Sequence, residues 1–299
     1  MVSVGEGHEI YVEQCGNPAG QSVVVLHGGP GGGCSPFMRR FFDPTYYRII
    51  LFDQRGCGRS RPHASIEANT TQHLIRDIET LRAELRFGKA VLFGGSWGAT
   101  LALAYAQAHP EGVSGLVLRG VFLGLQRELD WFYGGGAARF FPDIWRNFTA
   151  PIPESEQGDL IAAYHRRLFC DDPAREARFA LPWSTWENSL AAMDVMVTGH
   201  SPSAYTRAFA RLENHYFFNR CFIEEGQLLR DRGKIEHLPA TIVQGRYDMV
   251  CPPFSAWELA EGWENAALEM IPASGHALSE PRIAAQLVRT MDRMRDHPR

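Results

Sequence analysis

The sequence predicts an α/β protein in which a mostly parallel sheet carries helices on both faces and is interrupted by an inserted, mainly helical cap domain. Two observations lead to this expectation. Before residue 121 and after residue 236, short and nearly continuous apolar runs alternate with helical periodicity, which is typical of strands buried on both faces of a parallel sheet. Between these positions aromatic residues multiply, prolines interrupt the pattern and clear β runs are absent.

The first part of the chain alternates strand and helix signals in a regular order. The apolar run at 22–26 predicts a buried strand that ends in a glycine-rich turn. The spacing of Leu74, Ile78 and Leu81 predicts one buried face of a helix. Up to residue 120 we expect an opening hairpin at 8–15 and short strands at 22–26, 48–52, 89–93 and 116–118. We also expect two helices, one at 71–86 and one from the 94–98 turn to about 109.

The rest of the chain divides into the insertion and a return to the sheet. Strand character returns at 241–244 and 268–271, and an amphipathic helix follows from about Pro281. We therefore expect residues 1–120 and 237–299 to form one core, and residues 121–236 to form the cap.

Composition and charge exclude several classes of protein. Hydrophobic residues make up 45% and charged residues 21%, as in ordinary soluble domains. The formal net charge of −4 and the absence of a Lys/Arg run argue against nucleic acid or an anionic membrane as partner. No leader-like segment and no apolar run of about 18 residues is evident, so we expect a cytoplasmic protein. The six cysteines are scattered without a CxxC pair, which disfavours a disulfide framework and a metal site.

The segment Gly94-Gly95-Ser96-Trp97-Gly98 fits the pattern G-x-S-x-G between an apolar run and a helix. This strand, turn and helix setting is typical of the nucleophile of the α/β-hydrolase fold. Side chains at 94 and 98 would obstruct so sharp a turn. Glycine and serine also make ordinary turns, so the position of the motif rather than the motif alone makes Ser96 the expected nucleophile.

A serine hydroxyl needs a base, and the base needs an acid that fixes its tautomer. Asp248 and His276 follow two later strands in the order Ser, Asp, His that this fold uses. An aspartate after a strand is often a turn former and a single histidine is often structural. Because both lie beyond the carboxyl ends of strands, where open α/β sheets place their sites, we expect a catalytic role for each.

The glycine-rich loop at 27–33 directly follows the strand at 22–26. A phosphate-binding loop is the alternative, but the pattern G-x-G-x-x-G starting at Gly29 meets Cys34 at its last position, and no Gly-Lys-Ser/Thr is present. In a hydrolase such a loop supplies a backbone N–H to the oxyanion of the tetrahedral intermediate. We assign that role to Gly29, with Gly28 as the adjacent possibility, together with Trp97.

Several stretches, from near the start of the chain to its last strand, form a recognisable set: HGGPGGG (27–33), DQRGCGRS (53–60), GGSWGATLALAYAQAHP (94–110), RGVF (119–122), WENSL (186–190), ENHYF (213–217), GRYDMVCPP (245–253) and SGHA (274–277). Together they resemble the prolyl aminopeptidases, also called proline iminopeptidases. The resemblance implies a serine exopeptidase that releases the N-terminal proline of peptides through a prolyl-enzyme, without metal or organic cofactor. Its triad falls on Ser96, Asp248 and His276.

The resemblance also implies a substrate site in the cap. Glu187 and Glu213 match the two glutamates that bind the free amino terminus of the substrate, and the proline pocket falls on Phe122, Tyr133 and Cys251. Each residue has a plainer interpretation. From the residues alone, a salt bridge to one of the cap arginines is favoured for either glutamate, ordinary packing for Phe122 and Tyr133, and a buried thiol for Cys251. The arginines in question are Arg207, Arg211 and Arg220.

Two other functions stay open. One is a different hydrolase of the same fold, such as an esterase, an amino-acid amidase or an aminopeptidase of broader specificity. The other is a non-catalytic binding protein, which would lack part of the catalytic set. An aspartate-nucleophile enzyme is excluded because position 96 is serine. The expected partners are peptides that begin with proline, with neither nucleic acid nor membrane, and the expected assembly is a monomer or a small homo-oligomer.

Overall fold

A seven-stranded sheet forms the centre of the computed structural model, which describes residues 1–193 and 203–296. Its strand order is β3-β5-β4-β6-β7-β8-β9, and all neighbours are parallel except β3 and β5. The mostly parallel sheet expected from the sequence is therefore confirmed. The strands are β3 (Val12–Gly16), β4 (Gln21–Leu26), β5 (Tyr47–Phe52), β6 (Ala90–Ser96), β7 (Val113–Val121), β8 (Ala240–Gly245) and β9 (Ala266–Ile271).

Apolar side chains cover both faces of this sheet. In β4, Val24 and Leu26 belong to one hydrophobic cluster and Val23 and Val25 to the other, because successive side chains of a strand point to opposite faces. The first face packs against α1 (Thr71–Glu84), α2 (Trp97–Ala108) and α9 (Pro253–Ala260). The second packs against the 3₁₀ helix at 36–41 and α10 (Pro281–Asp296). Continuous apolar strands are thus explained by burial on both sides.

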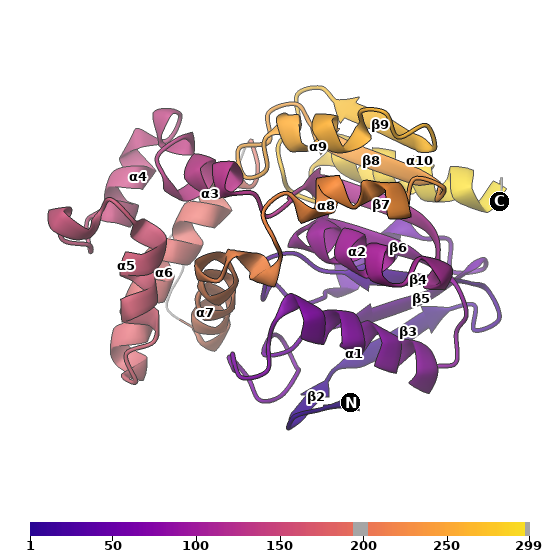
Figure 1. Cartoon of the computed structure of the whole chain (residues 1–299), viewed down its shortest axis with the longest axis horizontal. Coiled ribbons are helices and arrows are strands. Elements are labelled where there is room, and N and C mark those ends of the chain that lie inside the picture. Colours follow the sequence, from indigo (N-terminus) through magenta and orange to yellow (C-terminus); the bar gives the residue numbers. More distant parts are fainter. Residues whose placement is uncertain (194–202, 297–299) are drawn as a thin grey trace.

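The segment between β7 and β8 is helical and lies to one side of the sheet (Figure 1). No strand occurs between β7 and β8 among its described residues, and 194–202 of the expected cap lie outside them. Side-chain caps start three of the helices: Asp159, Asp172 and Ser203 each accept backbone N–H groups. The larger helices are α3 (Gln126–Tyr133), α4 (Pro142–Thr149), α5 (Leu160–Leu168), α6 (Pro173–Leu190) and α7 (Ala204–Phe218).

The end of this segment returns to the sheet side of the molecule. The short helix α8 (Gln227–Arg230) lies beside α2 (Figure 1), and Gln107 Nε2 donates a hydrogen bond to Leu228 O at 2.8 Å. The division of the chain at residues 121 and 236 stays a prediction.

The opening hairpin lies earlier than expected. Strands β1 (Val2–Gly5) and β2 (His8–Ile10) pair with each other, whereas β3 leaves to pair with β5. The turn between β1 and β2 is Glu6-Gly7, with φ of 54° and 77°, and two left-handed residues are what a tight hairpin turn requires. The prediction of a hairpin over 8–15 is therefore wrong, because the turn falls before residue 8.

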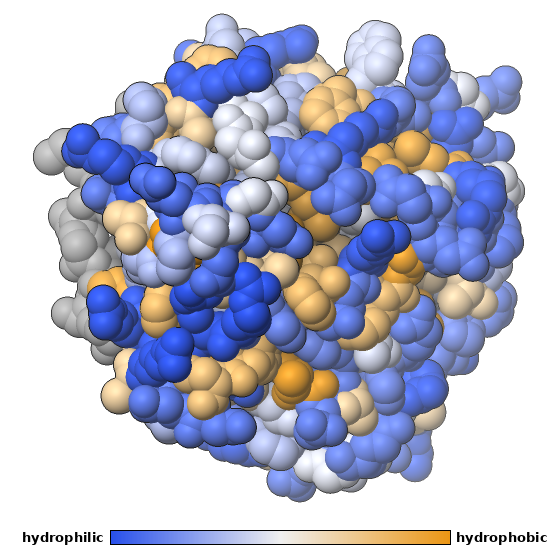
Figure 2. Space-filling model, turned by 60° about the vertical axis from the view of Figure 1, so that its left-hand side comes forward, coloured by the Kyte–Doolittle hydropathy of each residue, from blue (hydrophilic) through white to orange (hydrophobic). Residues whose placement is uncertain are grey.

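The surface on the cap side is mainly hydrophilic, with hydrophobic residues in small groups (Figure 2). Among the described residues, no helix combines the length and the apolar character that crossing a membrane would need.

Candidate functional site

Ser96 lies at the sharp turn between β6 and α2, with φ of 57° and ψ of −127°. A Cβ at Gly94 would lie 2.2 Å from Gly98 O, and one at Gly98 would lie 2.0 Å from Leu26 O. Both distances are far below van der Waals contact, so the turn exists only with glycine at these two positions. The steric reason expected for the two glycines is confirmed.

Asp248 and His276 come together from the ends of β8 and β9. His276 Nδ1 donates to Asp248 Oδ2 at 2.7 Å, and the other carboxylate oxygen accepts from the N–H groups of Val250 and Cys251. The pair fits because position 120 is glycine, with φ of +53°: a Cβ there would lie 2.8 Å from His276 Nδ1. The ring orientation that a general base needs is therefore fixed by its surroundings.

The Ser96 hydroxyl does not yet contact this pair. Among the described residues no hydrogen bond joins it to His276, and its Oγ lies 3.9 Å from Cys251 Sγ. Catalytic hydrogen bonds in unliganded enzymes often form fully only when substrate is bound.

Arg119, from β7, lies beneath this group of residues. Its Nη1 donates to His276 O at 2.7 Å, and its guanidinium lies against Gly95, where a Cβ would be 2.4 Å from Nη2. Burial lowers the pKa of His276, and the positive charge of Arg119 acts in the same direction, whereas Asp248 raises it. The net lowered pKa keeps the imidazole neutral near neutral pH, as a base must be.

The loop at 27–33 is held close to Ser96. Gln54 N donates to His27 Nε2 at 3.0 Å, Gly33 N donates to His27 Nδ1 at 3.2 Å, and the same Nδ1 lies 2.9 Å from Gly28 O, so the buried imidazole ties the two ends of the loop together. A Cβ on Gly28 would lie 3.3 Å from that of Ser96. Gly29 has φ of +111°, in the left-handed region that glycine tolerates.

One small cavity brings together most of the residues singled out in the sequence. Its walls include Gly29, Ser96, Phe122, Glu187, Glu213 and Cys251. Tyr133 stands behind this wall, with its hydroxyl donating to Glu213 Oε2 at 3.3 Å, and Trp97 begins α2 directly after Ser96. The residues from core and cap therefore surround a common space next to the serine.

The two glutamates lie side by side, and neither forms a salt bridge within the part of the chain that the structure describes. Glu213 is buried and accepts hydrogen bonds from Trp183 Nε1 and the Tyr133 hydroxyl, whereas Glu187 Oε2 is buried without a partner. The two carboxyl groups also interact directly with each other. Burial, and then the negative charge of Glu213, raise the pKa of Glu187 well above its usual range. Burial likewise raises the pKa of Glu213.

The salt bridges that the residues alone favoured form elsewhere. Arg207 and Arg211 both pair with Glu176, with shortest N to O distances of 2.5 and 2.7 Å. Among the described residues, neither Glu187 nor Glu213 has a salt bridge to any of the cap arginines.

Aromatic rings pack in the wall of the cavity and behind it. Phe122 meets Phe217 edge to face, with ring centres 5.6 Å apart, and Tyr133 stacks on Trp183 at 4.4 Å. These rings give the cavity a rigid apolar wall.

Sequence reasoning missed several residues of the cavity. Phe132, Phe217, Val250 and Glu128 also line it. Glu128 is buried and accepts from the N–H groups of Leu123 and Leu125 and from the Ser255 hydroxyl, and burial raises its pKa to about 7. Its position three residues into α3 was a signal that could have been used, because glutamate at that position often binds the N-terminal N–H groups.

The described residues contain neither a disulfide nor a set of metal ligands. All six cysteines are free, and the described residues contain no group of three or more His, Cys, Asp or Glu placed to hold a metal ion. That the reaction uses neither metal nor cofactor stays a prediction.

The fold and this site define an α/β hydrolase: residues 21–282 match the model of the alpha/beta hydrolase fold family, and the predicted class is confirmed. The chain is 51% identical over 296 residues to a proline iminopeptidase of Xylella fastidiosa, covering 98% of this chain and 95% of that protein. It is 52% identical to a proline iminopeptidase of Xanthomonas citri, covering 97% and 94%. Within the α/β hydrolases, the chain belongs to the proline iminopeptidase family.

A solved structure supports the fold independently. The crystal structure of a proline iminopeptidase from Mycobacterium smegmatis superimposes with a TM-score of 0.62 at 17% identity, covering 98% of this chain and 97% of that one. The family resemblance inferred from the motifs is thus confirmed by the full-length relatives.

Proposed function

We propose that this protein is a prolyl aminopeptidase, a serine exopeptidase that removes the N-terminal proline of peptides and of prolyl amides or anilides. The observation that carries this proposal is the cavity in which Ser96 lies with Glu187 and Glu213, two carboxyl groups without a salt bridge to any described residue. An enzyme that cuts one residue from a free amino terminus needs a nucleophile and an anionic group at a fixed separation.

In the proposed reaction Ser96 Oγ attacks the carbonyl carbon of the N-terminal proline. His276 accepts the hydroxyl proton at Nε2, since its Nδ1 is engaged by Asp248. The carboxylate of Asp248 then stabilises the imidazolium. This division of roles follows from the tautomer that the 2.7 Å contact fixes.

The second half of the cycle uses the same groups. The backbone N–H groups of Gly29 and Trp97 hold the negative oxygen of each tetrahedral intermediate. His276 gives its proton to the leaving amine, and water, activated by the same imidazole, hydrolyses the prolyl ester on Ser96.

Substrate selection is assigned to the cap. The protonated imino nitrogen of proline carries two N–H donors, and Glu187 and Glu213 offer one carboxylate for each. The proline ring then lies against Phe122, Tyr133 and Cys251. Glu213 is buried, and Oε2 of the half-buried Glu187 is shielded from solvent. Pairing with the ammonium therefore has a large electrostatic effect, which an acylated amine would lose.

Removal of the nucleophile tests the chemistry. Ser96→Ala should abolish hydrolysis of proline 4-nitroanilide and labelling by a fluorophosphonate probe, with unchanged thermal unfolding. Activity within about tenfold of wild type would contradict the assignment of Ser96.

The competing esterase or amidase function is tested with substrates rather than variants. The wild-type enzyme should hydrolyse proline 4-nitroanilide and leave its N-acetyl derivative nearly untouched. Equal rates on the free and blocked compounds would contradict exopeptidase action. Faster hydrolysis of alanine 4-nitroanilide than of the proline compound would indicate a broader aminopeptidase.

We also propose a cytoplasmic location, which the six free cysteines support, since unpaired cysteines are typical of a reducing compartment. Fractionation of cells that express the protein tests it. A monomer or small homo-oligomer stays the predicted assembly.

A further inference from the structure

The proposed function requires a fixed separation between two groups that come from different parts of the chain. Glu213 lies on α7 in the cap segment, whereas Ser96 and Trp97 lie at the junction of β6 and α2. A displacement of about 1 Å between binding and reacting groups can cost roughly a hundredfold in rate. The contacts that seat α7 on the sheet side of the molecule therefore bear directly on catalysis.

Leu212, directly before Glu213, packs onto two glycines of the core loops. A Cβ at Gly31, in the loop that carries Gly29, would lie 3.1 Å from Leu212 Cβ. A Cβ at Gly56 would lie 2.9 Å from Leu212 Cδ2. Helix α7 thus approaches both loops more closely than other residues at these positions would allow.

Tyr216 makes the second contact, one helical turn after Glu213 and on the same side of α7. Its buried ring meets the Trp97 ring edge to face, with centres 4.7 Å apart, and its hydroxyl donates to Asn69 Oδ1 at 2.8 Å. Trp97 is itself held by Gln54, which accepts from its Nε1 at 2.9 Å. One side chain of α7 therefore touches the residue whose backbone N–H is assigned to the oxyanion.

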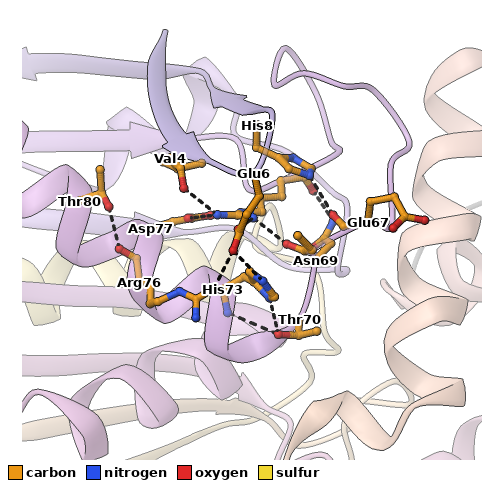
Figure 3. Close-up of polar contacts among 12 residues, drawn as sticks. Val4, Glu6, His8, Glu67, Asn69, Thr70, His73, Arg76, Asp77 and Thr80 are labelled. Carbon is orange, nitrogen blue, oxygen red and sulfur yellow. Dashed lines mark hydrogen bonds and ion pairs between the residues drawn. The ribbon is translucent and has the colours of Figure 1, made fainter.

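Asn69 is a rigid support for this contact. Its Nδ2 donates to Arg55 O at 3.1 Å and to Ser65 O at 3.0 Å, and its carbonyl accepts from His215 Nε2 at 3.0 Å. Figure 3 shows Asn69 in the loop before α1, close to Glu67 and Thr70, with Asp77 on the helix.

The loop around Asn69 is in turn fixed by a buried ion pair. The Arg55 guanidinium donates to both carboxylate oxygens of Asp77, at 2.8 and 2.7 Å, and to Ala68 O at 2.7 Å. Both side chains of this pair are almost completely buried. A bidentate, buried pair of this kind gives the loop one defined position.

We propose that Tyr216 and Asn69 are positioning residues that set the separation between the amine site at Glu213 and the oxyanion site at Trp97. The inference rests on the proposed function, because it assigns those two sites their roles. Tyr216 does not touch the substrate; it acts through α7 and Trp97. Loss of the Tyr216 hydroxyl should therefore impair substrates that engage both sites and spare substrates that engage only the oxyanion site.

The test compares two substrates on one variant. Tyr216→Phe removes the bond to Asn69 and keeps the ring on Trp97. We expect kcat for proline 4-nitroanilide to fall about tenfold, and kcat/KM for 4-nitrophenyl acetate, which has no amine, to change less than about twofold. Tyr47→Phe is the matched control: it also removes a buried hydroxyl, which donates to Met291 O at 2.7 Å, and should leave both activities unchanged.

A double variant tests whether Tyr216 acts through Glu213. In the Glu213→Gln background, Tyr216→Phe should cause less than about a twofold further loss on the prolyl substrate, because the amine site no longer contributes. A full tenfold further loss, or an equal loss on both substrates in the single variant, would overturn the positioning role. The proposed function fails differently: wild-type enzyme would hydrolyse the ester but not the prolyl anilide, and the positioning role would fall with it.

Discussion

Helices α6 and α7 bury a glutamate carboxylate between them at two places, and the two places differ in how that carboxylate is paired. At the first, Glu176 on α6 pairs with Arg207 and Arg211 on α7. At the second, Glu187 on α6 meets Glu213 on α7, and neither has a salt bridge to a described residue. Burying a carboxylate costs free energy unless it is paired. The difference between the two places supports the proposal that the second one binds the substrate ammonium.

The largest effect on activity is expected from a change at Glu213, in the second of these places. Glu213→Gln should lower kcat/KM for proline 4-nitroanilide by roughly a hundredfold, about 3 kcal/mol, because the ammonium loses a buried charged partner. The rate with 4-nitrophenyl acetate should stay within about threefold of wild type. An equal loss on both substrates would show that Glu213 supports the structure rather than the amine.

Breaking the salt bridges of Glu176 with Arg207 and Arg211 should affect the stability of the protein rather than its substrate selectivity. Glu176→Gln should lower the free energy of unfolding by about 2 kcal/mol, because two arginines lose their carboxylate. Urea unfolding measures the loss. The preference for free over N-acetylated prolyl anilide should survive, and a loss of that preference would mean that the two places do not act separately.

Glu187 and Glu213 should also make the stability of the protein depend on pH. Because their pKa values are raised, the folded protein keeps a proton above the ordinary glutamate pKa of about 4.3. The unfolded chain binds fewer protons in that range, so stability is full below it and falls as pH rises. Glu187→Gln removes the part of this effect that comes from Glu187, although burial still raises the pKa of Glu213. The variant should be about 1.5 kcal/mol more stable than wild type at pH 8.

Thermal or urea unfolding of the two proteins at pH 5 and pH 8 measures this difference. Glu128, whose pKa is raised to about 7, acts in the same direction in both proteins and cancels from the comparison. A variant less stable than wild type at pH 8 would contradict the account of the pair.

The smallest effect is expected from the outer arginine. Arg207 is 30% exposed in its side chain, and Arg211 would still neutralise Glu176 without it. Arg207→Gln should therefore cost only about 0.5 kcal/mol of stability. A cost equal to that of Glu176→Gln would show that Arg207 alone holds the buried carboxylate.

The catalytic side of the site could be predicted because its signals are local. Ser96 is marked by glycines whose steric need is visible in the motif, and Asp248 and His276 follow strands that the fold places side by side. The 2.7 Å contact between the last two agrees with that placement. Their roles in catalysis stay proposals until the variants are measured.

The substrate side could not be predicted from the residues, for a geometric reason. Glu176 and Glu187 lie about three turns apart on one face of α6, so helical periodicity in the sequence does not distinguish them. Which of them meets the arginines of α7 depends on how the two helices are offset along their axes. That offset is a tertiary property, and only the family resemblance pointed to Glu187.

The error in the opening hairpin has a different, local origin. Residues 8–10 form a strand, but the turn at Glu6-Gly7 pairs them with β1 and not with β3. Helix α9 was not predicted, because it is only eight residues long and has Pro252 and Pro253 at its start, which are also typical of a loop. Glu128 was missed although its place in the first turn of α3 is a local signal, and its bond to Ser255 joins segments far apart in the sequence.

The contact between Arg119 and Gly95 restricts how this family of sequences can vary. Position 95 is the first variable site of G-x-S-x-G, yet here the guanidinium of a neighbouring strand occupies the space that any side chain would need. The two positions should therefore evolve together. Among related sequences, a residue other than glycine at 95 should occur with the loss of the arginine at 119, and aligned relatives can be searched for that exchange.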